Sequence, residues 1–211
     1  PILFVLFTTP FLIKTGIKYG FVDKINQRKI HSGAIPRIGG IGIALGTMTP
    51  LFILFFYNNG VSNTLFGSIE NVIVIIFGGI AISLLGLYDD ILGASAKFKL
   101  LIQIVLSVVA IYCGFSINAM STPWGVIDLG WTGHIITIFW IVGIINAFNL
   151  IDGMDGLSSG VSFFACITIM SLAIVNGYMF VALVSAALAG AVVGFLVYNF
   201  NPAKIFMGDS G

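Results

Sequence analysis

Long apolar runs alternate with short polar segments along this chain, and that pattern predicts a bundle of helices that cross a membrane. The predicted helices are residues 1–13, 38–57, 71–88, 100–117, 134–148, 157–175 and 178–198. The last six are 15 to 21 residues long, which suits a hydrocarbon core of about 30 Å. The first run is too short to span such a core, so we expect it to belong to a clipped helix.

Composition supports the membrane assignment. The 211 residues are 58% hydrophobic and only 8% charged, whereas soluble domains carry about 25% charged residues. A chain this poor in charge is not a string of soluble domains. We therefore expect an all-α polytopic membrane protein, a helical bundle of about seven helices that forms one domain over residues 1–211.

The basic residues all fall on one side of the predicted topology. They are Lys14, Lys18, Lys24, Arg28, Lys29, Arg37, Lys97, Lys99 and Lys204. The segments on the other side, 58–70, 118–133 and 176–177, contain none. The positive-inside rule makes the basic face cytoplasmic. On the opposite side, Trp124 and Trp131 lie among turn residues, which predicts an interfacial hairpin within 118–133.

Six of the acidic residues share the basic face. They are Asp23, Asp89, Asp90, Asp152, Asp155 and Asp209, and only Glu70 and Asp128 fall on the other side. The positive-inside rule does not require this partition, because acids contribute little to it. Acids and bases that meet on one face of a nearly uncharged protein predict a polar site there.

Small residues predict where helices touch. Gly42 and Gly46 are four residues apart, as are Gly190 and Gly194. This spacing places both members of each pair on one helix face, where a neighbouring helix can approach closely. We interpret both pairs as packing surfaces.

The adjacent carboxylates Asp89 and Asp90 are predicted to lie at a helix end. Neighbouring carboxylates repel unless a cation or a donor lies between them, and the negative end of the helix dipole disfavours them further. The pair therefore indicates a magnesium or proton site. A solvated helix terminus is the alternative.

The stretch 146–157 spaces two amides and two carboxylates three residues apart: Asn146, Asn149, Asp152 and Asp155. On a helix such residues fan over one broad face, and carboxylates with amide neighbours are hard oxygen ligands of the kind that bind magnesium. The alternative is a capped turn, in which Asp155 is the N-cap of the helix that starts at residue 157.

Two further segments contain candidate residues. Asp209 is a glycine-flanked aspartate in a terminal segment that could face a phosphate or a metal. The first loop carries Arg28, Lys29, His31 and Arg37, which could bind substrate phosphates. Those bases could equally set the topology and contact anionic lipid, and without context topology is the better explanation.

Four ordered blocks carry a family resemblance. They are Asp-Lys-Ile-Asn-Gln-Arg-Lys-Ile-His (23–31) with Pro-Arg-Ile-Gly-Gly (36–40), Tyr-Asp-Asp-Ile-Leu-Gly (88–93) with Lys97 and Gln103, Asn-Ala-Phe-Asn-Leu-Ile-Asp-Gly-Met-Asp-Gly-Leu (146–157), and Asn-Pro-Ala-Lys-Ile-Phe-Met-Gly-Asp-Ser-Gly (201–211). In this order they resemble the polyprenyl-phosphate N-acetylhexosamine-1-phosphate transferases, the family of WecA, TagO and MraY. The wording of the blocks is closer to WecA and TagO.

The resemblance implies a reaction at the cytoplasmic face of the bacterial plasma membrane. A polyprenyl phosphate such as undecaprenyl phosphate attacks a UDP-N-acetylhexosamine, most simply UDP-GlcNAc. The products are polyprenyl-diphosphate-sugar and UMP, and cell-envelope glycan synthesis is thereby initiated. Magnesium, with manganese as the alternative, would offset the repulsion between two anionic reactants.

The resemblance also implies residue roles. Asp89 and Asp90 handle magnesium or diphosphate and activate the lipid phosphate, and Asp209 coordinates magnesium. Asp152 and Asp155 act as catalytic residues in the block that also contributes Asn146 and Asn149 to the nucleotide-sugar site. The remaining substrate-binding residues are Lys97, Arg28, Lys29, His31 and Arg37.

Other expectations concern partners and alternatives. No nucleic-acid partner is expected, and a homodimer is left open. The family continues past Gly211 with more helices and a histidine-bearing loop, so we expect a fragment that lacks one wall of the site and is inactive alone. A cation transporter and an inactive envelope scaffold are the competing functions. Transport is disfavoured because the acids lie at helix ends, whereas transport sites lie near the midplane.

Overall fold

The computed structural model describes residues 1–22, 35–54, 56–57 and 60–211. Three predicted substrate-binding residues, Arg28, Lys29 and His31, lie outside these ranges, so their role stays a prediction. The helices and strands are α1 (Ile2–Tyr19), α2 (Gly39–Leu54), α3 (Gly60–Phe66), α4 (Ile69–Leu92), α5 (Ala96–Tyr112), β1 (Ala119–Thr122), β2 (Gly125–Asp128), α6 (Thr132–Ile151), α7 (Leu157–Val175) and α8 (Met179–Asn199).

Each of the seven predicted helices is present, and the all-α class is confirmed. Among the described residues, five helices are long and apolar enough to cross a membrane: α1, α4, α6, α7 and α8. Helix α2 is a shorter apolar helix. Segment 58–70 was predicted as a polar connection, and the structure places the short helix α3 within it.

Two helices extend beyond their predicted ends. Helix α1 continues through Lys14 and Lys18 to Tyr19, because lysine favours helix and the first left-handed glycine, Gly20, comes only then. Helix α4 continues to Leu92 and ends at Gly93, whose φ is 75°. Asp89 and Asp90 therefore lie in the last turn of α4, at the helix end as predicted, although the helix itself runs on to Leu92.

The hairpin predicted between the fourth and fifth membrane segments is confirmed. Strands β1 and β2 pair antiparallel, with Thr122 opposite Gly125. Gly125 closes the turn at a φ of 131°, which a side chain would disfavour. Trp124 at the tip is 93% exposed, as expected for an aromatic side chain at a membrane interface.

Helix α8 lies at the centre of the bundle and contacts α1, α2, α3 and α7. Its buried core includes Val192 and Phe195, which pack with Val5 of α1. The predicted packing surfaces are confirmed, because α1 lies against both glycine pairs: a Cβ at Gly46 would overlap Val5, and one at Gly194 would press on the first turn of α1.

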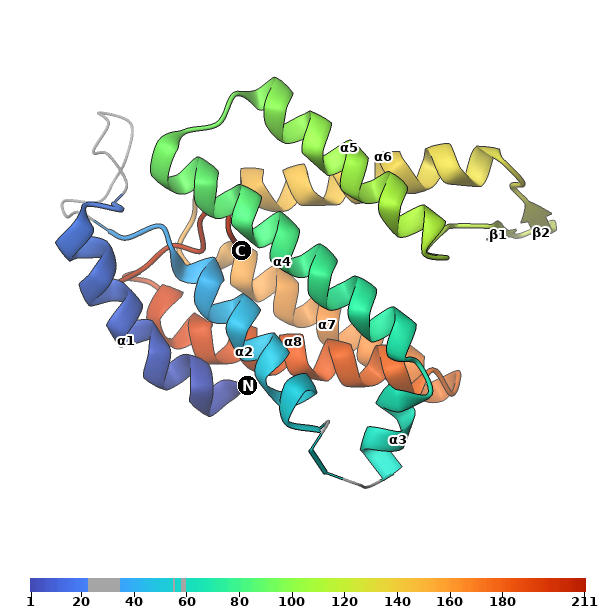
Figure 1. Cartoon of the computed structure of the whole chain (residues 1–211), viewed down its shortest axis with the longest axis horizontal. Helices are drawn as coiled ribbons and strands as arrows, with labels where there is room; N and C mark the ends of the chain where they lie inside the picture. The colour runs from blue at the N-terminus through green and yellow to red at the C-terminus, as the bar shows by residue number, and fades with distance from the viewer. Residues whose placement is uncertain (23–34, 55, 58–59) are drawn as a thin grey trace.

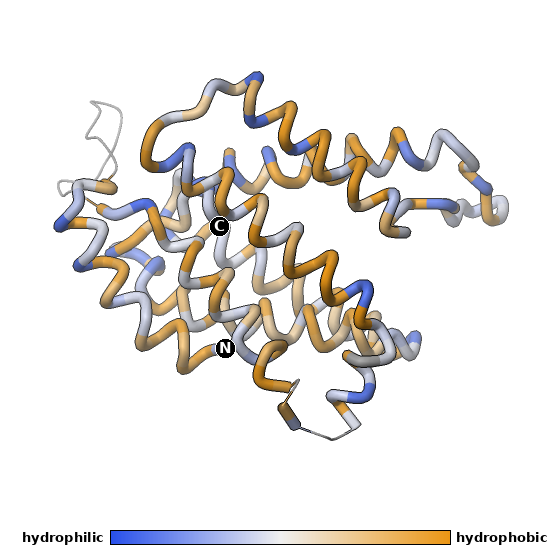
Figure 2. The backbone as a smooth tube through the Cα atoms, in the orientation of Figure 1, coloured by the Kyte–Doolittle hydropathy of each residue, from blue (hydrophilic) through white to orange (hydrophobic). Residues whose placement is uncertain are grey.

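The outer surface of the bundle is apolar. Large side chains such as Phe7, Phe77 and Phe164 are 80%, 69% and 70% exposed. Hydrophobic positions dominate the middle of the helices, and polar positions gather toward their ends (Figure 2). A water-soluble protein rarely shows such a continuous apolar surface, so this is a multi-pass membrane protein.

The last residues return to the middle of the molecule, where the end of the chain lies near α2, α4 and α6 (Figure 1). Segment 205–207 runs beside the start of α2: the Gly39 amide donates to the Phe206 carbonyl at 3.1 Å, and the Gly40 amide to the Met207 carbonyl at 2.8 Å. A Cβ at Gly40 would overlap Gly211. The glycines of the Pro-Arg-Ile-Gly-Gly block are therefore needed for close backbone contact.

Candidate active site

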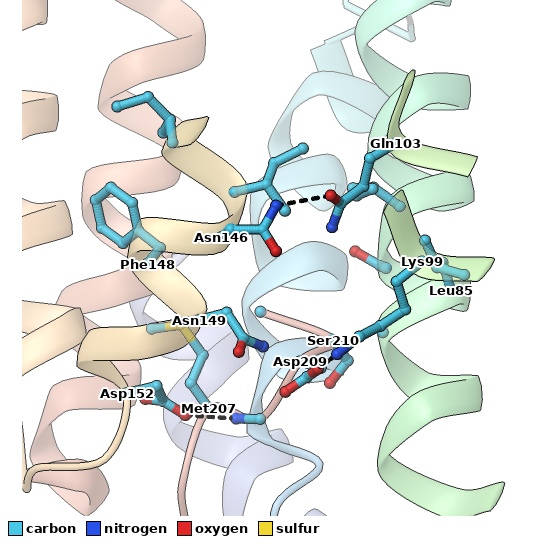
Figure 3. Close-up of a pocket in the computed structure, with 17 residues that line it drawn as sticks. Leu85, Lys99, Gln103, Asn146, Phe148, Asn149, Asp152, Met207, Asp209 and Ser210 are labelled. Carbon is cyan, nitrogen blue, oxygen red and sulfur yellow. Dashed lines mark hydrogen bonds and ion pairs between the residues drawn. The ribbon is translucent and has the colours of Figure 1, made fainter. Parts of the chain in front are cut away.

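A cavity of about 230 Å³ opens where the ends of α4, α5 and α6 meet residues 207–211. Apolar side chains of α4 and α6 line one part, among them Leu85 and Phe148, while Lys99, Asn149 and Asp209 line another (Figure 3). Four segments that are distant in the sequence thus form one polar pocket at the ends of membrane helices.

Asp209 lies in a tight turn that begins with Gly208. The φ of Gly208 is 72°, and a Cβ there would overlap the Arg37 carbonyl. The Gly208 amide donates to Asp152 at 2.9 Å, and the amides of Asp209 and Ser210 donate to Asp90 at 3.0 and 3.1 Å. These bonds hold the turn and leave the Asp209 carboxylate facing the cavity.

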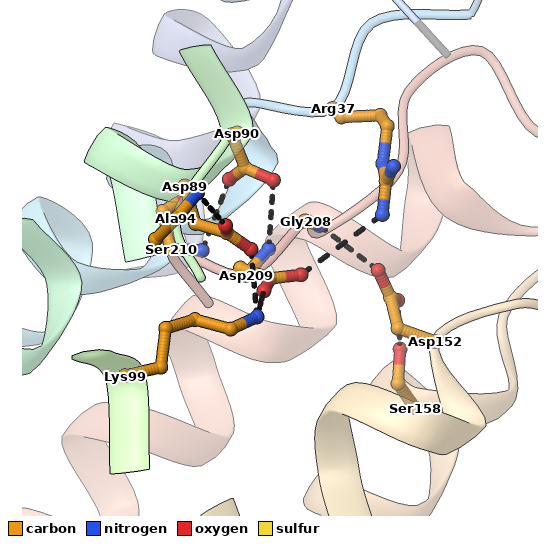
Figure 4. A network of polar contacts seen from close by, with 10 residues as sticks. All are labelled: Arg37, Asp89, Asp90, Ala94, Lys99, Asp152, Ser158, Gly208, Asp209 and Ser210. Carbon is orange, nitrogen blue, oxygen red and sulfur yellow. Dashed lines mark hydrogen bonds and ion pairs between the residues drawn. The ribbon is translucent and has the colours of Figure 1, made fainter. Parts of the chain in front are cut away.

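Lys99 joins two carboxylates. Its ammonium lies 2.7 Å from Asp89 Oδ2 and 2.6 Å from Asp209 Oδ2 (Figure 4). The other Asp89 oxygen accepts the Ala94 amide at 2.6 Å. Ser95 is the N-cap of α5 and accepts the Phe98 amide, which fixes where the helix starts and therefore where Lys99 points.

The structure places Lys99 in the pocket instead of Lys97. Lys97 is exposed and is not among the residues that line the cavity. Residues two apart on a helix point about 200° apart, so only one of the two can face the site. The sequence held one indication that Lys99 faces the site: Gln103 follows it by four residues and therefore lies on the same helix face. The phosphate-binding role of Lys97 stays a prediction.

The amides of α6 line the same pocket. Asn146 donates to Gln103 Oε1 at 2.7 Å and so joins α6 to α5. Asn149 lies nearer Asp209, with its side-chain amide toward that carboxylate (Figure 3). Both predicted substrate-binding amides therefore line the cavity. Asn149 lies beside the charged residues, and Asn146 lies about one helical turn away from it.

Asp155 does not cap α7. The N-cap of that helix is Gly156, in the left-handed conformation and without a side-chain cap bond. Asp155 Oδ2 instead accepts from the Asn201 side chain at 3.1 Å and from the Ala203 amide at 3.0 Å. The capped-turn alternative is wrong for this residue, which ties the α6–α7 turn to the segment after α8.

Burial changes the acidity of Asp209 and of Asp152. Burial raises the pKa of Asp209, the Asp89 carboxyl adds to the rise, and Lys99 opposes it. Burial also raises the pKa of Asp152, while bonds from Ser158 and Gly208 partly offset it. A raised carboxyl pKa means that the anion is disfavoured unless a cation is near. Arg37 contributes one positive charge, with Nη2 at 3.9 Å from Asp209 Oδ1.

The carboxylates of Asp89 and Asp209 fit a magnesium ion whose other ligands would come from a substrate and water. Within the described ranges, no group of three or more histidine, cysteine, aspartate or glutamate side chains is arranged to hold a metal. Magnesium, however, is usually held by one or two carboxylates together with waters and substrate phosphates. Asp89 and Asp209 already converge on one cationic group, whereas both oxygens of Asp90 accept backbone amides.

Fold and site together define a multi-pass helical membrane protein with a carboxylate-rich pocket at the ends of its helices. The model of Glycosyl transferase family 4 matches residues 72–211, and the chain belongs to that family.

Two relatives illustrate the range of the similarity. A Bacillus subtilis (strain 168) protein named "Probable undecaprenyl-phosphate N-acetylglucosaminyl 1-phosphate transferase" is 37% identical over all of this chain and 56% of its own length. A Listeria monocytogenes protein named "Phospho-N-acetylmuramoyl-pentapeptide-transferase" is 33% identical over 96% of this chain and 64% of its own. The chain thus spans about six-tenths of the length of these relatives.

Substitution of each lysine in turn tests whether Lys99 or Lys97 serves the site. We expect Lys99→Met to lower the activity proposed below about a hundredfold, because it removes the only cation that bridges Asp89 and Asp209 among the described residues. Lys97→Met is the matched comparison on the same helix, and we expect a change below about threefold. Initial rates of both variants show which lysine the reaction needs. The opposite order of effects would assign the phosphates to Lys97.

Proposed function

We propose that the protein transfers an N-acetylhexosamine 1-phosphate, most simply GlcNAc-1-phosphate, from a UDP-sugar to polyprenyl phosphate. The observation that carries the proposal is the cluster of Asp89, Lys99 and Asp209 beside a partly apolar cavity at the ends of membrane helices. A lipid phosphate requires such a boundary, with its head among charges and its chain among apolar side chains. The names of the two relatives support the same chemistry.

The reaction is a phosphoryl transfer between two anions. An oxygen of the lipid phosphate forms a bond to the phosphorus that carries the sugar, and the bond from that phosphorus to the oxygen of UMP breaks. Catalysis of this kind depends mainly on positioning and charge neutralisation. The Lys99 ammonium and the Arg37 guanidinium both lie beside Asp209. There they would neutralise part of the charge of a phosphate bound next to that carboxylate.

We propose magnesium as the cofactor, held by Asp209 and Asp89 together with substrate phosphate oxygens. When bound, the ion would polarise the phosphoryl group and offset the repulsion between the reactants. Its binding requires ionised carboxylates. Because burial raises the pKa of Asp209, protons compete with the metal for this group more strongly than for an exposed aspartate.

We further propose that the site faces the cytoplasm of a bacterial cell at the plasma membrane. All nine lysine and arginine residues lie on that side of the predicted topology. UDP-sugars are made in the cytoplasm, so the donor would reach the pocket without crossing the bilayer.

An assay of UMP release tests the proposal. The full-length protein in lipid nanodiscs, supplied with UDP-GlcNAc, undecaprenyl phosphate and magnesium, is expected to release UMP and to form a lipid-linked sugar diphosphate. Omission of the lipid or addition of a chelator should abolish both products. If neither UDP-GlcNAc nor another UDP-N-acetylhexosamine gave UMP, the proposal would be wrong.

A further inference from the structure

The Asp209 turn is held by backbone bonds from two sides. Three consecutive amides, those of Gly208, Asp209 and Ser210, donate to carboxylates. Asp152, at the end of α6, accepts the first, and Asp90, in the last turn of α4, accepts the other two. The turn therefore connects α4 and α6, two of the three helices that border the pocket (Figure 4).

The two neighbouring carboxylates of α4 make different contacts. Asp89 accepts one backbone amide and the Lys99 ammonium, so one of its oxygens is shared with the charged cluster. Asp90 uses Oδ1 for the Asp209 amide and Oδ2 for the Ser210 amide. Asp90 is thus already engaged at both oxygens by the chain itself.

The same face of α4 is shaped to receive the turn. Gly86 precedes Asp90 by four residues and lies on the same side of the helix. A Cβ at Gly86 would overlap the Asp209 carbonyl. The turn therefore rests on bare helix backbone at Gly86 and is bonded by Asp90 one helical turn later.

We propose that Asp90 is a positioning residue, which fixes the Asp209 turn through two backbone bonds and so sets where the Asp209 carboxylate meets Lys99 and the metal. Asp90 neither abstracts a proton nor binds the metal in this assignment. The inference deepens the proposed function, because the metal and the transfer reaction rest on that proposal. The restraint on the turn is a property of the fold and does not depend on it.

Hydrogen–deuterium exchange measures the restraint without substrate or metal. In the full-length protein in nanodiscs, Asp90→Asn places an amide donor against one of the two backbone amides. We expect the amides of 209 and 210 to exchange about tenfold faster. Asp89→Asn is the matched control, since Asp89 bonds none of the turn amides among the described contacts, and we expect a change below about twofold. Unchanged exchange in Asp90→Asn would overturn the proposal.

Magnesium titration separates positioning from direct catalysis. Under the proposal, Asp90→Asn raises the half-saturating magnesium concentration about tenfold, because Asp209 is no longer held in place. At saturating magnesium, kcat returns to within about threefold of the natural protein. A kcat that stays low at every magnesium concentration would show that Asp90 takes part in the chemistry, and would overturn the assignment. If the natural protein shows no activity, the proposed function fails while the exchange result still decides the role in the turn.

Discussion

Asp209→Asn is expected to lower the transfer rate about a thousandfold, the equivalent of about 4 kcal/mol of transition-state stabilisation. Asparagine keeps the shape of the side chain but removes the charge that a magnesium ion would bind. The Lys99–Asp89 pair and the backbone bonds of the turn do not need that charge, so the fold should persist. Initial rates of UMP release, measured over a range of magnesium concentrations, give the result.

Asp128→Asn on the hairpin is the control for this substitution. Asp128 is exposed and accepts the Gly130 amide. In the predicted topology it lies on the side of the membrane opposite the pocket. Both variants should elute from size exclusion as the natural protein does. Natural rates in Asp209→Asn would remove this carboxylate from the proposed metal site.

Gly86→Ala is expected to inactivate the protein by displacing the Asp209 turn. A methyl group at this position would overlap backbone atoms of Asp209 and Ser210, and backbone cannot rotate away as a flexible side chain could. Overpacking of this kind typically costs about 1–3 kcal/mol. We expect a melting temperature several degrees below that of the natural protein, measured in detergent, together with the loss of UMP release.

Gly78→Ala provides the matched comparison within α4. A Cβ at Gly78 meets no atom within 4 Å, and alanine favours helix over glycine by about 1 kcal/mol. This variant should be at least as stable as the natural protein, and as active. Equal behaviour of the two variants would contradict the close approach of the turn to α4.

The helices were predictable because each membrane span must be apolar over most of its length and must satisfy its own backbone. Helix ends that depend on contacts with distant segments were not predictable. Helix α4 continues past its apolar run because Asp89 and Asp90 are bonded by partners from α5 and from the terminal segment. Helix α3 is too short to give a periodic signal in the sequence.

The candidate residues were largely predictable, but their contacts were not. Asp89, Asn149, Asp152 and Asp209 converge as a set of carboxylates and amides on one membrane face would suggest. Adjacent residues with the same chemistry nevertheless make different contacts, as with Asp89 and Asp90 or Lys97 and Lys99. Helix phase and the path of distant segments decide those differences, and neither is encoded in the local sequence.

The sequence by itself determined a multi-pass helical bundle with an acidic and basic site on one face, because burial in lipid restricts where charge can lie. Only the tertiary structure decided how that site is built. Residues 205–211 return to the start of α2 and to the end of α4, where glycines admit the backbone and carboxylates bond its amides. Those contacts join residues far apart in the chain, so packing and not local pattern selects them.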